Sequence, residues 1–194
     1  GRFDLPIALG ILAASGQIDR DTLAGCEFLG ELGLTGELRP VDGVLPAVLA
    51  ATRDGRRLVV PAGSGAEAAL APQARAYTAR TLLEACAALG GRTELPRAQA
   101  PAHVASQAAA DMADVRGQAQ ARRVLEVAAA GGHHLLMSGP PGCGKTLLAS
   151  RLPGLLPEAS EAEALETAAV ASTSGRGLDP TRWRQRPWRS PHHG

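Results

Sequence analysis

Residues 139–146 read Gly139-Pro140-Pro141-Gly142-Cys143-Gly144-Lys145-Thr146 and match the pattern G-x-x-x-x-G-K-[ST] at every fixed position. Each fixed residue type meets a physical need of a bound triphosphate. Glycines let the main chain turn tightly and bring its N–H groups against phosphate oxygens. The lysine supplies a point charge for the β- and γ-phosphates, and the threonine hydroxyl can ligate Mg²⁺. The pattern therefore predicts a phosphate-binding loop.

The residues on either side of the loop support this prediction. The apolar run 134–138 predicts a strand, and residues 147–152 predict a continuing helix whose N-terminus faces the anion. A chance glycine-rich turn is the alternative, and it fits this context poorly. We expect ATP to be bound by Gly139, Pro140, Pro141, Gly142, Cys143, Gly144, Lys145, Thr146 and Leu147. Thr146 is also the expected ligand of Mg²⁺.

Composition and charge describe a globular chain of one or two domains. The 20 basic and 19 acidic residues nearly cancel, so the net charge excludes no partner. Cys26, Cys86 and Cys143 have no metal-ligand spacing and are odd in number, which favours a reduced, cytoplasmic setting over a disulfide framework. No apolar run approaches the length of a membrane span and no signal peptide opens the chain, so no membrane partner is expected.

The first 90 residues alternate helical and extended patterns, as an α/β domain does. Residues 5–14 are apolar nearly all round and predict a buried helix. Residues 28–38 alternate apolar side chains with glycines and predict a strand or hairpin. Further elements are expected at 44–52 (helix), 58–61 (strand), 76–78 (strand) and 82–89 (helix). No strand precedes the first helix, so we expect this domain, residues 1–90, to be truncated on its N-terminal side.

A linker and a second unit are expected after the first domain. Gly90-Gly91, then Pro96 and Pro101 among Arg, Gln, Ala and Ser residues, predict a linker over residues 91–110. In the unit 111–194, a helix is expected after Gly117-Gln118, with apolar residues at i, i+3, i+4 and i+7, and another at 161–171. A phosphate-loop ATPase needs several more strands, at about 30 residues for each βαβ unit. Residues 147–194 are too few, so the ATPase domain is expected to be C-terminally truncated.

Both ends of the chain carry recognisable motifs. Residues 2–12 read Arg2-Phe3-Asp4-Leu5-Pro6-Ile7-Ala8-Leu9-Gly10-Ile11-Leu12, and residues 186–193 read Arg186-Pro187-Trp188-Arg189-Ser190-Pro191-His192-His193. Together with residues 117–157 they resemble the magnesium-chelatase-like AAA+ ATPases of the ComM and YifB type. The resemblance implies the N-terminal part of a P-loop α/β/α domain and Mg²⁺-dependent ATP hydrolysis in a cytoplasmic ring, usually of six subunits. It also implies work on DNA, as in branch migration during recombination and natural transformation.

Two other functions stay open at this point. One is a magnesium-chelatase-type ATPase that drives metal insertion into a porphyrin. The other is a truncated product that binds nucleotide and turns nothing over. Hydrolysis also needs a base, a sensor and an arginine from a neighbouring subunit, and the sequence assigns no residue to these catalytic roles.

The first domain also resembles the proteolytic domain of Lon, which implies an S5-like α/β fold. The nucleophile of such peptidases lies in a D-G-P-S-A-G-like turn, where Ile7 replaces the serine here. Their lysine follows a P-x-G-G-x stretch, and Leu45 stands in its place. Neither side chain can attack a carbonyl or activate a hydroxyl. We therefore expect a structural or interaction role and no peptidase activity.

The C-terminal segment is basic and carries tryptophans. Arginine can contact phosphates and tryptophan can stack on unpaired bases, so one hypothesis is a DNA-facing loop. The alternative is a loop packed between subunits or against the nucleotide, with Trp188 in a core. His192-His193 are expected to pack or to hydrogen-bond rather than to bind metal. The residues concerned are Arg176, Arg182, Trp183, Arg184, Arg186, Trp188 and Arg189.

Overall fold

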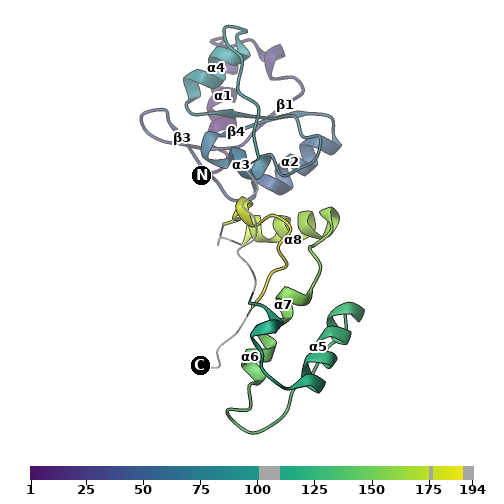
Figure 1. The fold of residues 1–194 in the computed structure, drawn as a ribbon. Coiled ribbons are helices and arrows are strands. Elements are labelled where there is room, and N and C mark those ends of the chain that lie inside the picture. The colour runs from purple at the N-terminus through teal and green to yellow at the C-terminus, as the bar shows by residue number, and fades with distance from the viewer. Residues whose placement is uncertain (101–109, 175–176, 190–194) are drawn as a thin grey trace. The chain divides into compact units, whose positions relative to one another are not determined.

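The computed structural model describes residues 1–100, 110–174 and 177–189 and divides into two compact units (Figure 1). The first unit comprises residues 1–103 together with residues 165–183. The second comprises residues 104–164 and 184–194. Among the described residues, no helix is both long and apolar enough to cross a bilayer.

A parallel sheet of three strands forms the centre of the first unit. Its order is β1 (Cys26–Phe28), β4 (Arg57–Pro61) and β5 (Ala76–Ala79). The central strand β4 has four consecutive buried residues, as expected of a parallel strand covered on both faces. Leu58 and Val60 enter one hydrophobic cluster and Val59 the other, because side chains alternate along a strand.

Helices cover both faces of this sheet (Figure 1). On the face of Val59 lie α1 (Asp4–Ala14) and α4 (Leu82–Leu89). On the opposite face lie α2 (Val44–Arg53) and α3 (Gly65–Ala68). Each fully buried leucine in these layers contributes roughly 2 kcal/mol of burial free energy. The remaining elements of residues 1–100 are the antiparallel pair β2 (Glu31–Leu32) and β3 (Leu38–Arg39) and the 3₁₀ turns η1 (Arg20–Leu23) and η2 (Ala62–Ser64).

The segment 165–183 completes the first unit, although it is distant in sequence. Within it, most of α8 (Glu161–Thr173) packs on the α2–α3 layer, and η4 (Pro180–Arg182) follows. The Ser172 side chain is 1% exposed, and its hydroxyl donates to Glu67 Oε1 at 2.6 Å. The same oxygen accepts the Leu45 N–H at 2.8 Å. The Gly43 N–H donates to the Ser172 carbonyl at 3.0 Å. Glu67 and Ser172 therefore link the α2–α3 layer to α8, which is distant from it in the sequence.

The described part of the second unit consists of helices and loops. The 3₁₀ turn η3 (Met112–Asp114) precedes α5 (Ala119–Gly131), which ends at Gly132 in the left-handed conformation. Two short helices follow, α6 (Lys145–Ala149) and α7 (Leu152–Leu155). A small core joins these elements through Met112, Val115, Leu125 and Leu148.

The α/β class and most of the predicted elements are confirmed. The helices predicted at 44–52, 82–89 and 161–171 correspond to α2, α4 and α8, and the strands at 58–61 and 76–78 correspond to β4 and β5. The helix expected after Gly117-Gln118 is α5. The predicted linker lies partly outside the described residues, and residues 96–98 run along β5, with the Ala98 N–H donating to the Ala76 carbonyl at 2.9 Å.

The strand predicted at 134–138 was wrong. These residues form no strand, and the side chain of Leu136 is 93% exposed. A strand needs a neighbour to pair its main-chain N–H and C=O groups, and no described segment of the second unit supplies one. The helix predicted at 147–152 is also shorter than expected, because α6 ends at Ala149 and a separate helix begins at Leu152.

The expectation that the first helix is buried all round was also wrong. Only the stripe formed by Leu5, Leu9 and Ala13 is buried in α1. Ile7 and Ile11 are 58% and 62% exposed. With 3.6 residues per turn, a helix lying on one face of a sheet buries a single stripe, so its opposite stripe faces away whatever its composition.

We predict that Glu67→Ala destabilises the first unit by about 1–3 kcal/mol, because the buried Ser172 hydroxyl and the Leu45 N–H lose their acceptor. Glu67→Gln keeps an acceptor oxygen and should recover part of this loss. Denaturant unfolding followed by tryptophan fluorescence measures both variants. Glu166→Ala, an exposed site on α8, is the matched control, and an equal loss there would refute the role of Glu67.

Candidate nucleotide-binding site

The backbone of the loop 139–146 turns through two left-handed glycines. Gly142 has a φ of 81° and Gly144 a φ of 89°, a region that residues with a Cβ adopt only at a cost. Cys143 lies between them, and its N–H donates to the Pro140 carbonyl at 3.4 Å. The chain then enters α6 at Lys145. Each glycine is thus where the turn requires it.

Several main-chain N–H groups of this loop have no acceptor in the part of the chain that the structure describes. Among the described residues, nothing accepts from the N–H groups of Gly142, Gly144, Lys145 or Thr146. Main-chain donors must be paired with protein, water or ligand, and neighbouring donors of this kind form a concavity that binds anions. The loop therefore presents a cluster of donors suited to phosphate oxygens.

Lys145 bonds to the beginning of the same loop. Its Nζ donates to the carbonyls of Gly139 at 2.8 Å and Pro140 at 2.9 Å and lies 3.5 Å from Cys143 Sγ. Sulfur is a weak acceptor, so a phosphate oxygen can replace it while both carbonyl bonds persist. Lys145 is also the only lysine among the 20 Lys and Arg residues of the chain. An ammonium is a compact point charge with three rotatable donors, which a planar guanidinium does not reproduce.

Thr146 and Leu147 occupy the first turn of α6. The Thr146 hydroxyl bonds to no other described residue, and Leu147 is 42% exposed. A hydroxyl oxygen is the kind of hard ligand that Mg²⁺ accepts, and that ion takes few ligands from the protein when phosphates supply the others. The donor set at Thr146 therefore fits a magnesium ion that arrives with a nucleotide.

Comparison with known proteins finds matches at both ends of this chain. The family model described as magnesium chelatase, subunit ChlI, matches residues 111–194, and a second, described as subunit ChlI of Mg-chelatase, matches residues 1–64. Competence protein ComM of Haemophilus influenzae is 48% identical over 198 residues, which cover 100% of this chain and 39% of that protein. The chain belongs to the magnesium-chelatase-like family.

Two further relatives in this magnesium-chelatase-like family are uncharacterized proteins named YifB. That of Salmonella typhimurium is 48% identical and that of Escherichia coli 46% identical, each over 193 residues. Both alignments cover 100% of this chain and 38% of the relative. The chain thus spans less than two fifths of the length of the curated relatives it matches.

Gln118 also contacts the loop 139–146, which its place in the sequence did not indicate. Its side-chain Nε2 donates to the Cys143 carbonyl at 3.3 Å. Gln118 adopts the left-handed conformation, with a φ of 49° and a ψ of 42°, directly before α5. A glutamine gives no sign of such a conformation in the sequence. The one available signal was its position at a helix start, a Gly-Gln pair upstream of the loop.

The basic C-terminal segment is partly bonded within its own unit. Arg186 donates to both carboxylate oxygens of Glu163 at 3.3 and 3.2 Å and to the Pro157 carbonyl at 2.8 Å. Arg184 Nε donates to the Ala159 carbonyl at 3.0 Å. Trp188 is 46% exposed in the single chain. Trp183 packs against the core of the first unit.

Parts of this segment lie outside the described residues, namely Arg176 and His192-His193. Among the residues that are described, no cluster of three or more His, Cys, Asp or Glu side chains is arranged to hold a metal ion.

Glu163 belongs to a capping box at the start of α8. The Ser160 N–H donates to Glu163 Oε2 at 2.8 Å, and Ser160 Oγ accepts the Glu163 N–H at 3.3 Å. The Ser160 N–H, followed by the Arg186 guanidinium, holds the pKa of the Glu163 carboxyl below its usual range. The S-x-x-E spacing is visible in the sequence and could have placed the start of this helix.

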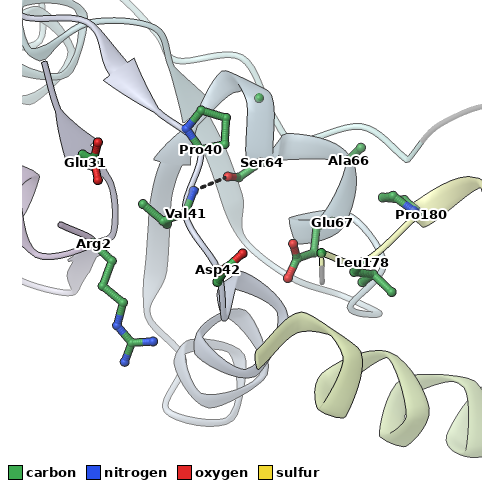
Figure 2. Close-up of a pocket in the computed structure, with 12 residues that line it drawn as sticks. Arg2, Glu31, Pro40, Val41, Asp42, Ser64, Ala66, Glu67, Leu178 and Pro180 are labelled. Carbon is green, nitrogen blue, oxygen red and sulfur yellow. Dashed lines mark hydrogen bonds between the residues drawn. The ribbon is translucent and has the colours of Figure 1, made fainter. Parts of the chain in front are cut away.

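The first unit contains a hollow of about 590 Å³ (Figure 2). Buried Ser64 lines it, and its Oγ accepts the Val41 N–H at 3.4 Å. None of the described lining residues is a lysine or a histidine, so no base of that kind accompanies the serine. At the two positions that resemble a peptidase dyad, Ile7 is 58% exposed and Leu45 is fully buried in the core.

We predict that Glu163→Gln weakens the acid dependence of stability. A folded-state pKa below the unfolded value means that ionised Glu163 stabilises the fold above its ordinary pKa of 4.5, and this contribution disappears as pH falls through the lowered pKa. Circular dichroism between pH 7 and pH 3 measures it. Glu166→Gln is the control, and parallel curves for wild type and Glu163→Gln would contradict the prediction.

Proposed function

We propose that this chain is the nucleotide-binding part of a Mg²⁺-dependent AAA+ ATPase. The observation that carries the proposal is the group of four unpaired N–H donors beside the Lys145 ammonium, in a loop with the complete G-x-x-x-x-G-K-[ST] pattern. Such donors stabilise negative charge when they converge on phosphate oxygens. Membership of the magnesium-chelatase-like family supports the use of nucleotide and Mg²⁺.

The residues of the loop take separate roles in this proposal. The N–H groups of residues 142–146 bind the β-phosphate, with that of Cys143 leaving its 3.4 Å bond to the Pro140 carbonyl. Lys145 neutralises charge on the β- and γ-phosphates, and the Thr146 hydroxyl ligates Mg²⁺. Gly139, Pro140, Pro141 and Leu147 complete the binding surface. Mg²⁺ supplies charge neutralisation on the phosphate oxygens when it is bound. Residues 1–194 supply no assigned base, sensor or trans arginine.

In the whole protein, we propose that ATP hydrolysis in a cytoplasmic ring of subunits does work on DNA. Support comes from the relative named competence protein ComM and from exposed Arg189 and Trp188, which suit phosphate contact and base stacking. Arg184 and Arg186 already bond within the second unit, so they contribute less to this case.

A second candidate function is an ATPase that drives metal insertion into a porphyrin. It is favoured by the descriptions of both family models, which name a magnesium chelatase subunit. The match over 100% of this chain to the relative named competence protein ComM favours the DNA motor over this second candidate. An ATPase rate of the whole protein that rises with branched or single-stranded DNA, and falls with salt, separates the two.

For the first domain, residues 1–90, we propose a structural or interaction role with no peptidase activity. Ile7 and Leu45 replace the dyad, and the only lysine of these 194 residues is Lys145 in the phosphate loop. A serine–lysine pair therefore cannot form among the residues of the first unit. The S5-like assignment and the boundaries of the linker, 91–110, and the ATPase part, 111–194, are parts of the same proposal.

We predict that Lys145→Ala weakens binding of Mg·ATP by about 10- to 100-fold, as expected for the loss of charge-assisted hydrogen bonds to phosphate. Isothermal titration of the 194-residue chain measures this. Lys145 also offers a direct assay, because an amine-acylating reagent can label only this side chain and the terminal amine. Mg·ATP should protect Lys145 from acylation.

The control is Arg123→Ala, which removes an exposed cation from α5 in the same unit. Its affinity for Mg·ATP should equal that of the wild type. Unprotected Lys145, together with equal affinities of wild type and Lys145→Ala, would show that the loop is not the nucleotide site.

A further inference from the structure

Gln118 combines an unfavourable backbone conformation with a contact to the phosphate loop. Its φ of 49° follows a φ of 69° at Gly117, so two successive residues are left-handed. A residue with a Cβ pays free energy for this conformation, and such strain persists where the surrounding structure fixes it. The side chain then reaches the Cys143 carbonyl at 3.3 Å. Among the described residues, no other side chain from outside residues 139–146 hydrogen-bonds to that loop.

The residues around Gln118 are anchored in the core of the second unit. Val115 is 2% exposed and Leu125 is 1% exposed. Arg122 makes two hydrogen bonds to the residues before it. Its Nη1 donates to the Val115 carbonyl at 3.4 Å, and its main-chain N–H donates to the Gln118 carbonyl at 3.0 Å. The loop residues Gly142 and Cys143 are exposed. Gln118 thus connects an exposed loop to a packed support.

The carbonyl that Gln118 holds belongs to a peptide unit of the binding surface. The Cys143 C=O and the Gly144 N–H are parts of one planar trans peptide and point in opposite directions. Fixing the carbonyl therefore fixes the direction of the Gly144 N–H, which is one of the unpaired donors. A Cβ placed on Gly144 would lie 3.2 Å from Gln118 Nε2, so the amide packs directly against this glycine.

We propose that Gln118 is a positioning residue for the phosphate chain of the nucleotide. Its side-chain amide holds the Cys143 carbonyl and thereby aims the Gly144 N–H at the phosphate. The role is directed at the phosphates and not at the nucleoside. This inference rests on the proposed nucleotide binding at Lys145 and adds a residue that orients the bound phosphates.

Titrating the 194-residue chain with Mg·ATP and with inorganic tripolyphosphate tests this. Gln118→Ala should lower the affinity for both ligands by about fivefold, the effect expected of one lost hydrogen bond. Gln120→Ala, at an exposed glutamine in the first turn of α5, is the matched control and should change neither affinity. Gln118→Asn keeps the amide and tolerates the left-handed conformation, but it is one methylene too short and should behave like Gln118→Ala.

Gln118→Gly separates positioning from a purely structural role. Glycine relieves the backbone strain, so its thermal stability should rise while its affinity for tripolyphosphate falls. Stability and affinity that fall together would overturn the proposal. So would a Gln118→Ala variant with unchanged affinities, or one that weakens ATP alone, which would place Gln118 at the nucleoside.

A wild-type chain that binds neither ligand would refute the proposed function. Nuclear magnetic resonance relaxation of the Gly144 amide then tests the positioning role by itself. A lower order parameter in Gln118→Ala than in wild type supports it, and an unchanged order parameter overturns it.

Discussion

Every main-chain N–H group needs a hydrogen-bond acceptor, and this requirement determines what the loop 139–146 of the second unit can bind. The left-handed turns at Gly142 and Gly144 direct a series of donors away from every carbonyl of the described chain. Lys145 adds a cation whose own bonds return to the loop at Gly139. Gln118 bonds to the carbonyl between the two glycines. Together these contacts hold the loop in a shape in which its main-chain N–H donors stay unpaired.

The tight turn of residues 139–146 was predictable because its geometry leaves little choice of residue, while phosphate binding there stays a prediction. A turn that needs two left-handed positions requires glycine there, and a compact cation requires lysine. The central strand β4 and the helices α2 and α4 could also be predicted, because the length and period of their apolar residues fit only one kind of element. Sequence is informative wherever a position admits few side chains.

What the sequence did not reveal depends on partners. Residues 134–138 have the composition of a strand, but pairing decides whether a strand forms. Ile7 lies on an apolar helix, yet the geometry of one sheet face leaves its stripe exposed. The left-handed state of Gln118 is set by neighbours that no local pattern encodes. The Glu67–Ser172 bond joins residues 105 positions apart, beyond the reach of any periodicity.

That distant bond bears on how the chain folds during synthesis. The first unit needs residues up to 183, and most of the second unit is translated before they leave the ribosome. Until then Ala168 and Ser172 of α8 are missing from the nascent first unit. The apolar surface of its α2–α3 layer therefore stays open to water or to a chaperone. Closing so long a loop adds entropy cost and slows the last step of folding. An early stop in translation would release a first unit with one layer unfinished.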